Sequence, residues 1–302
     1  MANLKSISGC ILWNFRMLLR DFRLYLGFLL GFLICCLLSQ KVLVLSRAYG
    51  TQIHVFEPFI WCFASGDHVL FSSLALFLPL SQLPRMDASA SFLLFRAGRS
   101  QWLLGQLLTV LLLSLAYSVF LVLSTCLLTL GHGSLTNNWS DTATILSFAP
   151  GNYDVALTVV RKTVKLSDPL TCACMIFLLT ALYMSLVSAL TLLFSLTQGR
   201  RAGISAAFLL SFCCYLLTPD RFLAWLDLPE QLAYVANLAA AWVSPLSHAT
   251  YTMHSFGFDD LPSLAQSTML LSIATLMLLI ISFAAARRMP IHFHKGDSYE
   301  RC

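Results

Sequence analysis

The sequence predicts an all-α polytopic integral membrane protein with six transmembrane helices, an N-terminal interfacial helix and a re-entrant segment before the last span. The first observation is composition: 58% of the 302 residues are hydrophobic and 11% are charged, whereas soluble domains carry about 25% charged residues. The second is a set of six apolar runs of about the length that crosses the hydrocarbon core. The third is an uneven distribution of basic residues between alternate connecting segments.

Six apolar runs are the predicted spans: Leu24–Leu45, Cys62–Gln82, Trp102–Leu130, Cys172–Leu196, Ala202–Thr218 and Leu264–Ala286. The first run is about 20 residues long, which exceeds a signal-peptide core, and no A-x-A site follows it, so we expect it to be retained. The chain has no linker rich in Gly, Ser or Pro. Residues 1–302 are therefore predicted to form one membrane domain, with an interfacial helix (1–23), the six-helix region (24–286) and a tail (287–302).

Two stripes precede the first span at helical spacing. The apolar stripe is Leu12, Phe15, Leu19 and Phe22, and a basic stripe turned by about 100° is Arg16, Arg20 and Arg23. This pattern favours a helix that lies in the membrane interface with its arginines among the lipid headgroups. The alternative is that the first span begins early and its arginines snorkel.

Two connecting segments are long. Gly131–Thr171 is polar, whereas Pro219–Pro262 is half apolar and too short and interrupted for two more spans. We expect the second to re-enter the membrane as short helices covered by protein. A Gly27-x-x-x-Gly31 spacing opens the first span and indicates close packing with a second copy or a neighbouring span.

The basic residues predict the orientation. With the N-terminus in the cytoplasm, 13 of the 19 Lys and Arg residues fall in cytoplasmic segments, as the positive-inside rule requires. Both termini are therefore predicted to be cytoplasmic in a multi-pass protein of the plasma membrane. The net charge of +5 reflects this topology, and no basic tract with interleaved aromatics indicates a nucleic-acid partner.

Several catalytic and binding motifs are absent. The chain has no G-x-x-x-x-G-K-[ST] loop for nucleoside triphosphate, no H-E-x-x-H and no G-x-S-x-G. The cysteine pairs lack zinc-site spacing, and the histidines and aspartates of residues 248–260 do not match metal-ligand spacings. No catalytic residue, cofactor site or metal site is predicted in this chain.

Asp67 and His68 are the candidate polar site within the membrane. An acid inside a span can bind a cation or a polar group of a substrate. The alternative is that the second span starts at Val69, which leaves both side chains in water.

The segment between the second and third spans carries a second candidate site. Asp87 or Ser89 can cap a short helix on which Ala88, Phe92 and Phe95 share a face, and Gly98 can end that helix. Arg96 and Arg99 then lie in water beside the third span, with Trp102 at headgroup level. The segment is either an ordinary basic loop or an amphipathic helix that docks a cytoplasmic partner.

Two motifs accompany this architecture: "LFRAGRSQWLLGQ" before the third span and "WVSPLSHATYTMHSFGFDDLPS" before the sixth. Together with the interfacial helix and six spans, they resemble the permease subunits of type-two ATP-binding-cassette (ABC) exporters. The resemblance covers nearly the whole chain, mainly as architecture, and the long segment Gly131–Thr171 is not part of the family pattern.

The resemblance implies a function. Such a permease forms the substrate path with a second copy, as a homodimer or heterodimer, and a separate ABC ATPase subunit binds ATP and Mg²⁺. It implies that Asp87, Phe92, Phe95, Arg96 and Arg99 form the ATPase-coupling helix. Arg16, Arg20 and Arg23 would lie on the connecting helix beside it, in contact with membrane lipid.

Two other functions fit the sequence. An intramembrane enzyme of the protease or acyltransferase type would depend on Asp67 and His68. A membrane scaffold or sensor that associates with such an ATPase without transporting anything would need neither.

Overall fold

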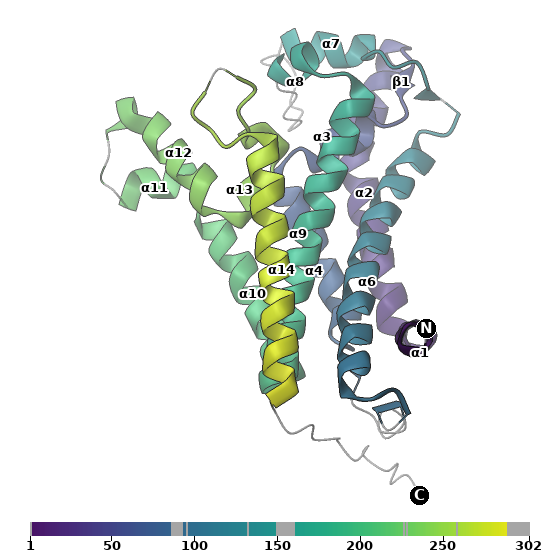
Figure 1. The fold of residues 1–302 in the computed structure, drawn as a ribbon. Helices are drawn as coiled ribbons and strands as arrows, with labels where there is room; N and C mark the ends of the chain where they lie inside the picture. Colours follow the sequence, from purple (N-terminus) through teal and green to yellow (C-terminus); the bar gives the residue numbers. More distant parts are fainter. Residues whose placement is uncertain are drawn as a thin grey trace, which may run out of the picture.

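The computed structural model describes residues 2–85, 93–94, 96–131, 133–148, 161–225, 227, 229–257 and 259–288. Four helices are long and apolar enough to cross a membrane: α2 (Phe22–Tyr49), α6 (Arg99–Leu128), α9 (Pro169–Gln198) and α14 (Leu264–Arg288). They run roughly side by side as a bundle (Figure 1). Each lies on a predicted span, so the all-α membrane fold is confirmed for these four.

The other two predicted spans are each part of a bent pair of helices. Helix α3 (Glu57–Phe63) meets α4 (Gly66–Leu80) at 89°, and α10 (Arg200–Leu216) meets α11 (Pro219–Trp225) at 74°. Helix α4 alone is about 22 Å long at 1.5 Å per residue. The predicted second span from Cys62 is therefore not one straight helix, because the chain changes direction after Phe63.

Helices α2, α4, α6, α9, α10 and α14 thus make six passages along the bundle. Four of them are long enough to span a membrane alone, and α4 and α10 each belong to a bent pair, so the chain has up to six spans. The chain is a multi-span helical membrane protein. Helix α9 is the central passage. Of its apolar 18-residue stretch, 56% is buried inside the protein, against 25% for α2 and 22% for α14. Helices α2 and α14 expose many of their leucines and isoleucines, which suits contact with lipid.

Short elements cover one end of the bundle, which we call the outer end (Figure 1). They are β1 (Ile53–His54), β2 (Gly133–Ser134), α7 (Asp141–Phe148), α8 (Arg161–Leu166), η1 (Glu230–Leu232), α12 (Ala233–Val243), α13 (Pro245–Ala249) and η2 (Tyr251–Met253). Strands β1 and β2 form one short parallel pair. The segment before α14 consists of short helices, as predicted, and its position relative to a membrane stays a prediction.

Helix α1 (Ala2–Leu18) is separate from α2 and is seen almost end on at the opposite end of the bundle, so it crosses the direction of the passages (Figure 1). It lies against α6: Asn14 Nδ2 donates to Thr109 Oγ1 at 3.0 Å, and Gln106 Nε2 donates to Asn14 Oδ1 at 3.2 Å. The predicted apolar stripe faces away from these contacts, with Leu12 and Leu19 exposed. The helix is confirmed and ends at Leu18, earlier than the stripe suggested.

The glycine pair of α2 packs within the chain. A Cβ on Gly27 would lie 2.7 Å from Pro79 Cδ, and a Cβ on Gly31 would lie 2.6 Å from the Tyr117 hydroxyl oxygen. Helices α4 and α6 therefore approach α2 at positions where only glycine fits without a shift of the neighbour. Of the two expected roles for this spacing, packing with neighbouring spans is confirmed.

Candidate functional site

The predicted cytoplasmic segments meet at one end of the bundle, which we call the basic end. Helices α2, α6 and α10 begin there, and α4, α9 and α14 end there (Figure 1). The basic residues of this end whose side chains the structure describes are Lys5, Arg16, Arg20, Arg23, Arg85, Arg96, Arg99, Arg200, Arg201 and Arg287. Among the residues that the structure describes, Asp21 is the one acid at this end.

Asp21 forms the hinge between α1 and α2. A turn at Leu19 and Arg20 follows α1, and Asp21 has an extended backbone that ends this turn. Its Oδ1 accepts a 3.1 Å hydrogen bond from the backbone N–H of Arg23, so it is the N-cap of α2. The carboxylate also lies at the positive end of the α2 dipole, which favours its negative charge. One residue thus sets the angle between the crossing helix and the first passage.

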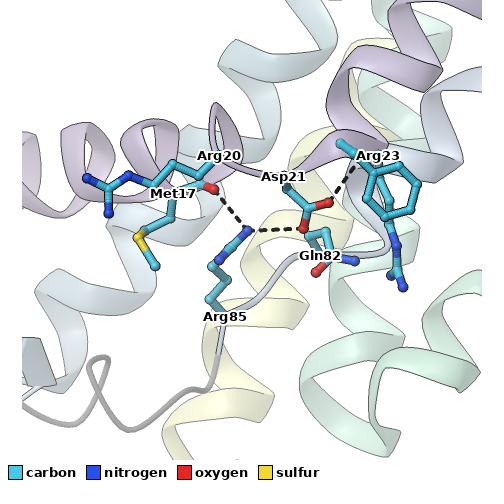
Figure 2. A pocket seen from close by; sticks show the side chains of 7 residues that line it. Met17, Arg20, Asp21, Arg23, Gln82 and Arg85 are labelled. Atoms are coloured by element: carbon cyan, nitrogen blue, oxygen red, sulfur yellow. Dashed lines mark hydrogen bonds and ion pairs between the residues drawn. The ribbon is translucent and has the colours of Figure 1, made fainter.

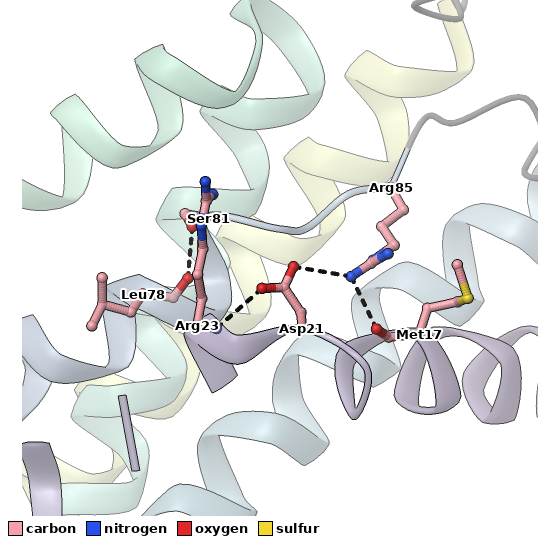
Figure 3. A network of polar contacts seen from close by, with 6 residues as sticks. All are labelled: Met17, Asp21, Arg23, Leu78, Ser81 and Arg85. Carbon is pink, nitrogen blue, oxygen red and sulfur yellow. Dashed lines mark hydrogen bonds and ion pairs between the residues drawn. The ribbon is translucent and has the colours of Figure 1, made fainter. Parts of the chain in front are cut away.

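Arg85 fastens this hinge from the far end of α4. Its Nη2 lies 3.4 Å from Asp21 Oδ2 and donates to the Met17 carbonyl at 3.0 Å, so one guanidinium contacts both sides of the turn (Figure 3). The side chains of Arg85 and Asp21 are 10% and 18% exposed. Water therefore screens this ion pair only partly, which makes it stronger than a fully exposed pair.

Gln82 and Ser81 complete the contact at the end of α4. With the Gln82 amide oriented to satisfy its neighbours, its nitrogen donates to Asp21 Oδ2 at 3.2 Å and its oxygen accepts from Arg23 Nε at 3.3 Å. The Ser81 hydroxyl donates to the Leu78 carbonyl at 2.6 Å, which caps the last turn of α4 (Figure 3). The end of α4 is thereby joined to the hinge through two side chains, those of Gln82 and Arg85.

An open pocket of about 330 Å³ lies beside the hinge (Figure 2). It is lined by Met17, Arg20, Asp21, Phe22, Arg23, Gln82 and Arg85. Three guanidinium groups and one carboxylate give the lining an excess of two positive charges. The pocket can therefore hold a negatively charged group.

The segment that follows Arg85 is fastened again at its other end. Arg99 Nη2 donates to the Ala286 carbonyl near the end of α14, in a bond between residues 187 positions apart. Leu93 and Leu94 pack with the buried Trp102 and with Phe283. Residues 86–98 thus connect a point bonded to the α1–α2 hinge with a point bonded to α14.

The predicted coupling residues divide into three groups. Arg96 is exposed, and the side chain of Arg99 is half-buried against α14. Asp87, Phe92 and Phe95 lie outside the described residues. Gly98 does interrupt the helical path before α6, with φ of +79° and its N–H bonded to the Leu94 carbonyl at 2.9 Å. Trp102 is buried within the protein. Its indole therefore does not face the lipid headgroups from the protein surface, as the prediction of a headgroup-level tryptophan implied.

The predicted connecting-helix residues Arg16, Arg20 and Arg23 are all exposed at the basic end, and only Arg16 lies within α1. Arg20 belongs to the turn and Arg23 to the first turn of α2. Arg20 and Arg23 both line the pocket, on either side of Asp21 (Figure 2).

Asp67 and His68 lie at the bend between α3 and α4. Asp67 is exposed in the first turn of α4, where its negative charge interacts favourably with the positive end of the helix dipole. His68 Nδ1 lies 2.6 Å from the Cys62 carbonyl, so it bonds the end of α3. The His68 bond stabilises the bend, and the Asp67 charge favours the start of α4.

Histidines of the segment before α14 make separate contacts. His248 Nδ1 lies 2.9 Å from Ser267 Oγ, and His254 Nδ1 lies 3.2 Å from the Tyr251 carbonyl. Within the described ranges, no group of three or more His, Cys, Asp or Glu side chains is placed to hold a metal ion.

Sequence reasoning missed Asp21, Gln82 and Arg85, which complete the site. One signal for Asp21 was present: it is the first acid of the chain, and it directly precedes the 28-residue helix α2, as a helix N-cap does. Arg85 had no comparable signal, because its partners are more than 60 positions away.

Comparison with known proteins gave no matching family model, no matching curated protein and no matching solved structure. The arrangement of the basic end is therefore interpreted from its geometry and charge alone.

Proposed function

We propose that this multi-span membrane protein is the permease subunit of an ABC exporter in the plasma membrane. The observation that carries the proposal is the double attachment of residues 86–98. Arg85 bonds Met17 and Asp21 of the hinge, and Arg99 bonds Ala286 of α14. A partner that displaced this segment would pull on α1 and α2 through Arg85 and on α14 through Arg99.

The cytoplasmic position of the basic end is part of the proposal. Its support is the excess of Lys and Arg in the short segments of that end, which is how positive charge is distributed in membrane proteins. A cytoplasmic ATPase could then reach both the exposed Arg96 and the hinge.

In this proposal the partner subunit binds ATP and Mg²⁺ and this chain binds neither. ATP binding and hydrolysis would alter the contact with residues 86–98 and thereby favour one arrangement of α1, α2 and α14. The cargo must bind the two arrangements with different affinity for this change to drive transport. A second permease copy would complete the path.

The enzyme alternative has no comparable support from the structure. Its candidates, Asp67 and His68, are an exposed first-turn acid and a side chain bonded to the Cys62 carbonyl. The bend between α3 and α4 explains both residues.

The test is purification of the tagged protein from its native host in mild detergent. We expect an ATP-hydrolysing subunit to be recovered with it in a fixed ratio. Recovery of this chain without an ATPase, under conditions that preserve other membrane complexes, would contradict the proposal. ATP-dependent flux of cargo in proteoliposomes made from the complex then separates a transporter from a scaffold or sensor.

A further inference from the structure

The pocket at the basic end has the size and charge of a small ligand site. Its volume of about 330 Å³ falls in the range of about 300–1,000 Å³ that is typical of ligand pockets. Asp21 is already engaged by the Arg23 N–H and by Arg85. Two further guanidinium groups line the pocket, those of the exposed residues Arg20 and Arg23, and the Arg23 group also donates to the Gln82 amide oxygen. Guanidinium groups bind phosphate oxygens in a bidentate manner.

Apolar side chains continue directly from this pocket onto the outer surface of the hinge. Phe22 lines the pocket and is 69% exposed, and Leu19 and Tyr25 are more than half exposed beside it. The Tyr25 hydroxyl donates to the Leu19 carbonyl at 2.8 Å, which holds the two residues together. A soluble anion would leave this apolar surface in water, whereas a ligand that carries acyl chains would cover it.

The depth of the pocket agrees with a lipid ligand. Its walls include the first two residues of α2, which is the point where the first apolar passage begins. The end of an apolar helix lies at the boundary between hydrocarbon and headgroups. Helix α1 extends sideways from the same point (Figure 1). A phosphate in the pocket would therefore be at the depth of the headgroups.

We propose that the hinge pocket binds the phosphate of an anionic phospholipid. The exposed guanidinium groups of Arg20 and Arg23, which lie on either side of Asp21 (Figure 2), turn to contact the phosphate, and the acyl chains lie along Leu19 and Phe22. Arg85 is a positioning residue, because its bonds to Asp21 and Met17 hold the turn that presents Arg20. The bound lipid joins α1, α2 and the end of α4 at the hinge. This inference depends on membrane insertion and is independent of the transporter proposal.

The test uses the purified full chain in detergent and follows its thermal unfolding during titration with lipid. Phosphatidylglycerol is the anionic probe, phosphatidylcholine with the same acyl chains is the zwitterionic probe, and inorganic phosphate is the chain-free probe. We expect phosphatidylglycerol to raise the unfolding temperature in a saturable manner, because a ligand that binds the folded state stabilises it. Phosphatidylcholine and inorganic phosphate should raise it far less.

The variant for this test is Arg20→Gln with Arg23→Gln, and the matched control is Arg201→Gln with Arg287→Gln. Both pairs remove two exposed positive charges at the basic end, but only the first pair lines the pocket. We expect the pocket variant to bind phosphatidylglycerol about tenfold more weakly or worse, since it loses charge-assisted bonds. The control should match the unsubstituted protein. If the pocket variant does not fold, Arg20→Lys with Arg23→Lys keeps the charge and should weaken binding by a smaller factor.

Four results would overturn the proposal. They are equal stabilisation by the two lipids, equal stabilisation by inorganic phosphate, equal loss in the pocket and control variants, and no loss in the pocket variant. If the pocket variant lost a protein partner on purification and still bound phosphatidylglycerol normally, the pocket would be a site for an acidic protein segment instead. The lipid titration requires no ATPase, so failure of the transporter proposal leaves its result unchanged.

Discussion

The two ends of the bundle hold their carboxylates in opposite ways. At the outer end, Glu57 is 1% exposed, and the N–H and hydroxyl of Ser140 donate to its two oxygens at 2.7 Å each. At the basic end, the Asp21 side chain is 18% exposed, lies among arginines and borders an open pocket. Glu57 is enclosed by its own chain, whereas Asp21 lies where a lipid or partner can approach.

The difference indicates a division of roles. The Ser140 hydroxyl also accepts from the Ala143 N–H at 3.1 Å and so caps α7, which means that Glu57 fastens the long outer segment to α3. Nothing from outside is needed to complete this contact. The hinge at the basic end instead leaves exposed cations beside an exposed apolar surface. We therefore expect changes at the outer end to alter stability and changes at the basic end to alter binding.

The largest expected effect is a pH dependence of stability that originates at Glu57. Burial raises the pKa of this carboxyl from 4.5 to about 7, and the bonds from Ser140 offset only part of that increase. The folded protein keeps the proton up to about pH 7, whereas the unfolded chain releases it near 4.5. The contribution is therefore fully stabilising below pH 4.5, is lost as pH rises to about 7, and amounts to about 3 kcal/mol.

Glu57→Gln removes this titration and keeps the shape of the side chain. Chemical unfolding in detergent from pH 4 to pH 8 should show that the difference between variant and unsubstituted protein changes by about 3 kcal/mol. Asp141→Asn, an exposed acid in the neighbouring helix α7, is the control and should change little. If the difference in unfolding free energy between Glu57→Gln and the unsubstituted protein did not change with pH, the proposed effect of burial on Glu57 would be wrong.

The second effect is the loss of the Ser140 hydroxyl. Ser140→Ala leaves a buried carboxyl with one fewer donor and α7 without its cap, which should cost about 2 kcal/mol. The loss should be larger above pH 7, where Glu57 is charged. Ser147→Ala is the control, because that buried hydroxyl bonds only the Thr144 carbonyl of its own helix. Equal losses in the two variants would show that the contact with Glu57 is energetically unimportant.

Much of the bundle could be predicted from the sequence. Long apolar runs specify α2, α6, α9 and α14, because about 20 apolar residues can be accommodated only by crossing the hydrocarbon. The break between α3 and α4 was missed, because Cys62 and Phe63 are as apolar as the helix that follows. Hydropathy records how apolar a segment is and carries no information on its direction.

The site was predicted only in part, for a different reason. The basic stripe and the charge bias of the connecting segments placed Arg20, Arg23 and Arg96 in segments that the structure brings to one end of the bundle. The bonds of Arg85 to Asp21 and of Arg99 to Ala286 join residues 64 and 187 positions apart. Such pairings arise from the packing of whole helices, so local spacing in one sequence cannot reveal them.

The third effect tests whether the hinge is weaker than the outer contact. Asp21→Asn removes the ion pair with Arg85 and keeps an N-cap side chain, so it should cost less than about 1 kcal/mol. Asp21→Ala also removes the cap and should cost about 1 kcal/mol more. Unfolding in detergent measures both. A loss from Asp21→Asn as large as that from Ser140→Ala would contradict the distinction between the two ends.

The smallest expected effect on stability is that of Arg96→Glu, and it is also the sharpest test of a binding role for the basic end. Arg96 is exposed, so the free energy of unfolding should change by less than about 0.5 kcal/mol. If residues 86–98 contact an ATPase as proposed, the reversed charge should reduce the transport obtained per ATP hydrolysed, or the amount of ATPase recovered. Arg221→Glu reverses an exposed charge in α11 at the outer end and should have neither effect.

Arg96 is preferable to Arg99 for this test, because Arg99 bonds the end of α14 and its replacement would change the fold as well as the surface. Including Arg99→Gln makes the comparison complete. It should lower both stability and coupling, whereas Arg96→Glu should lower coupling alone. Suppose that Arg96→Glu left coupling and ATPase recovery unchanged, while Arg99→Gln lowered stability and coupling. Arg99 would then serve only to join α6 to α14, and residues 86–98 would not be the surface on which the proposed ATPase docks.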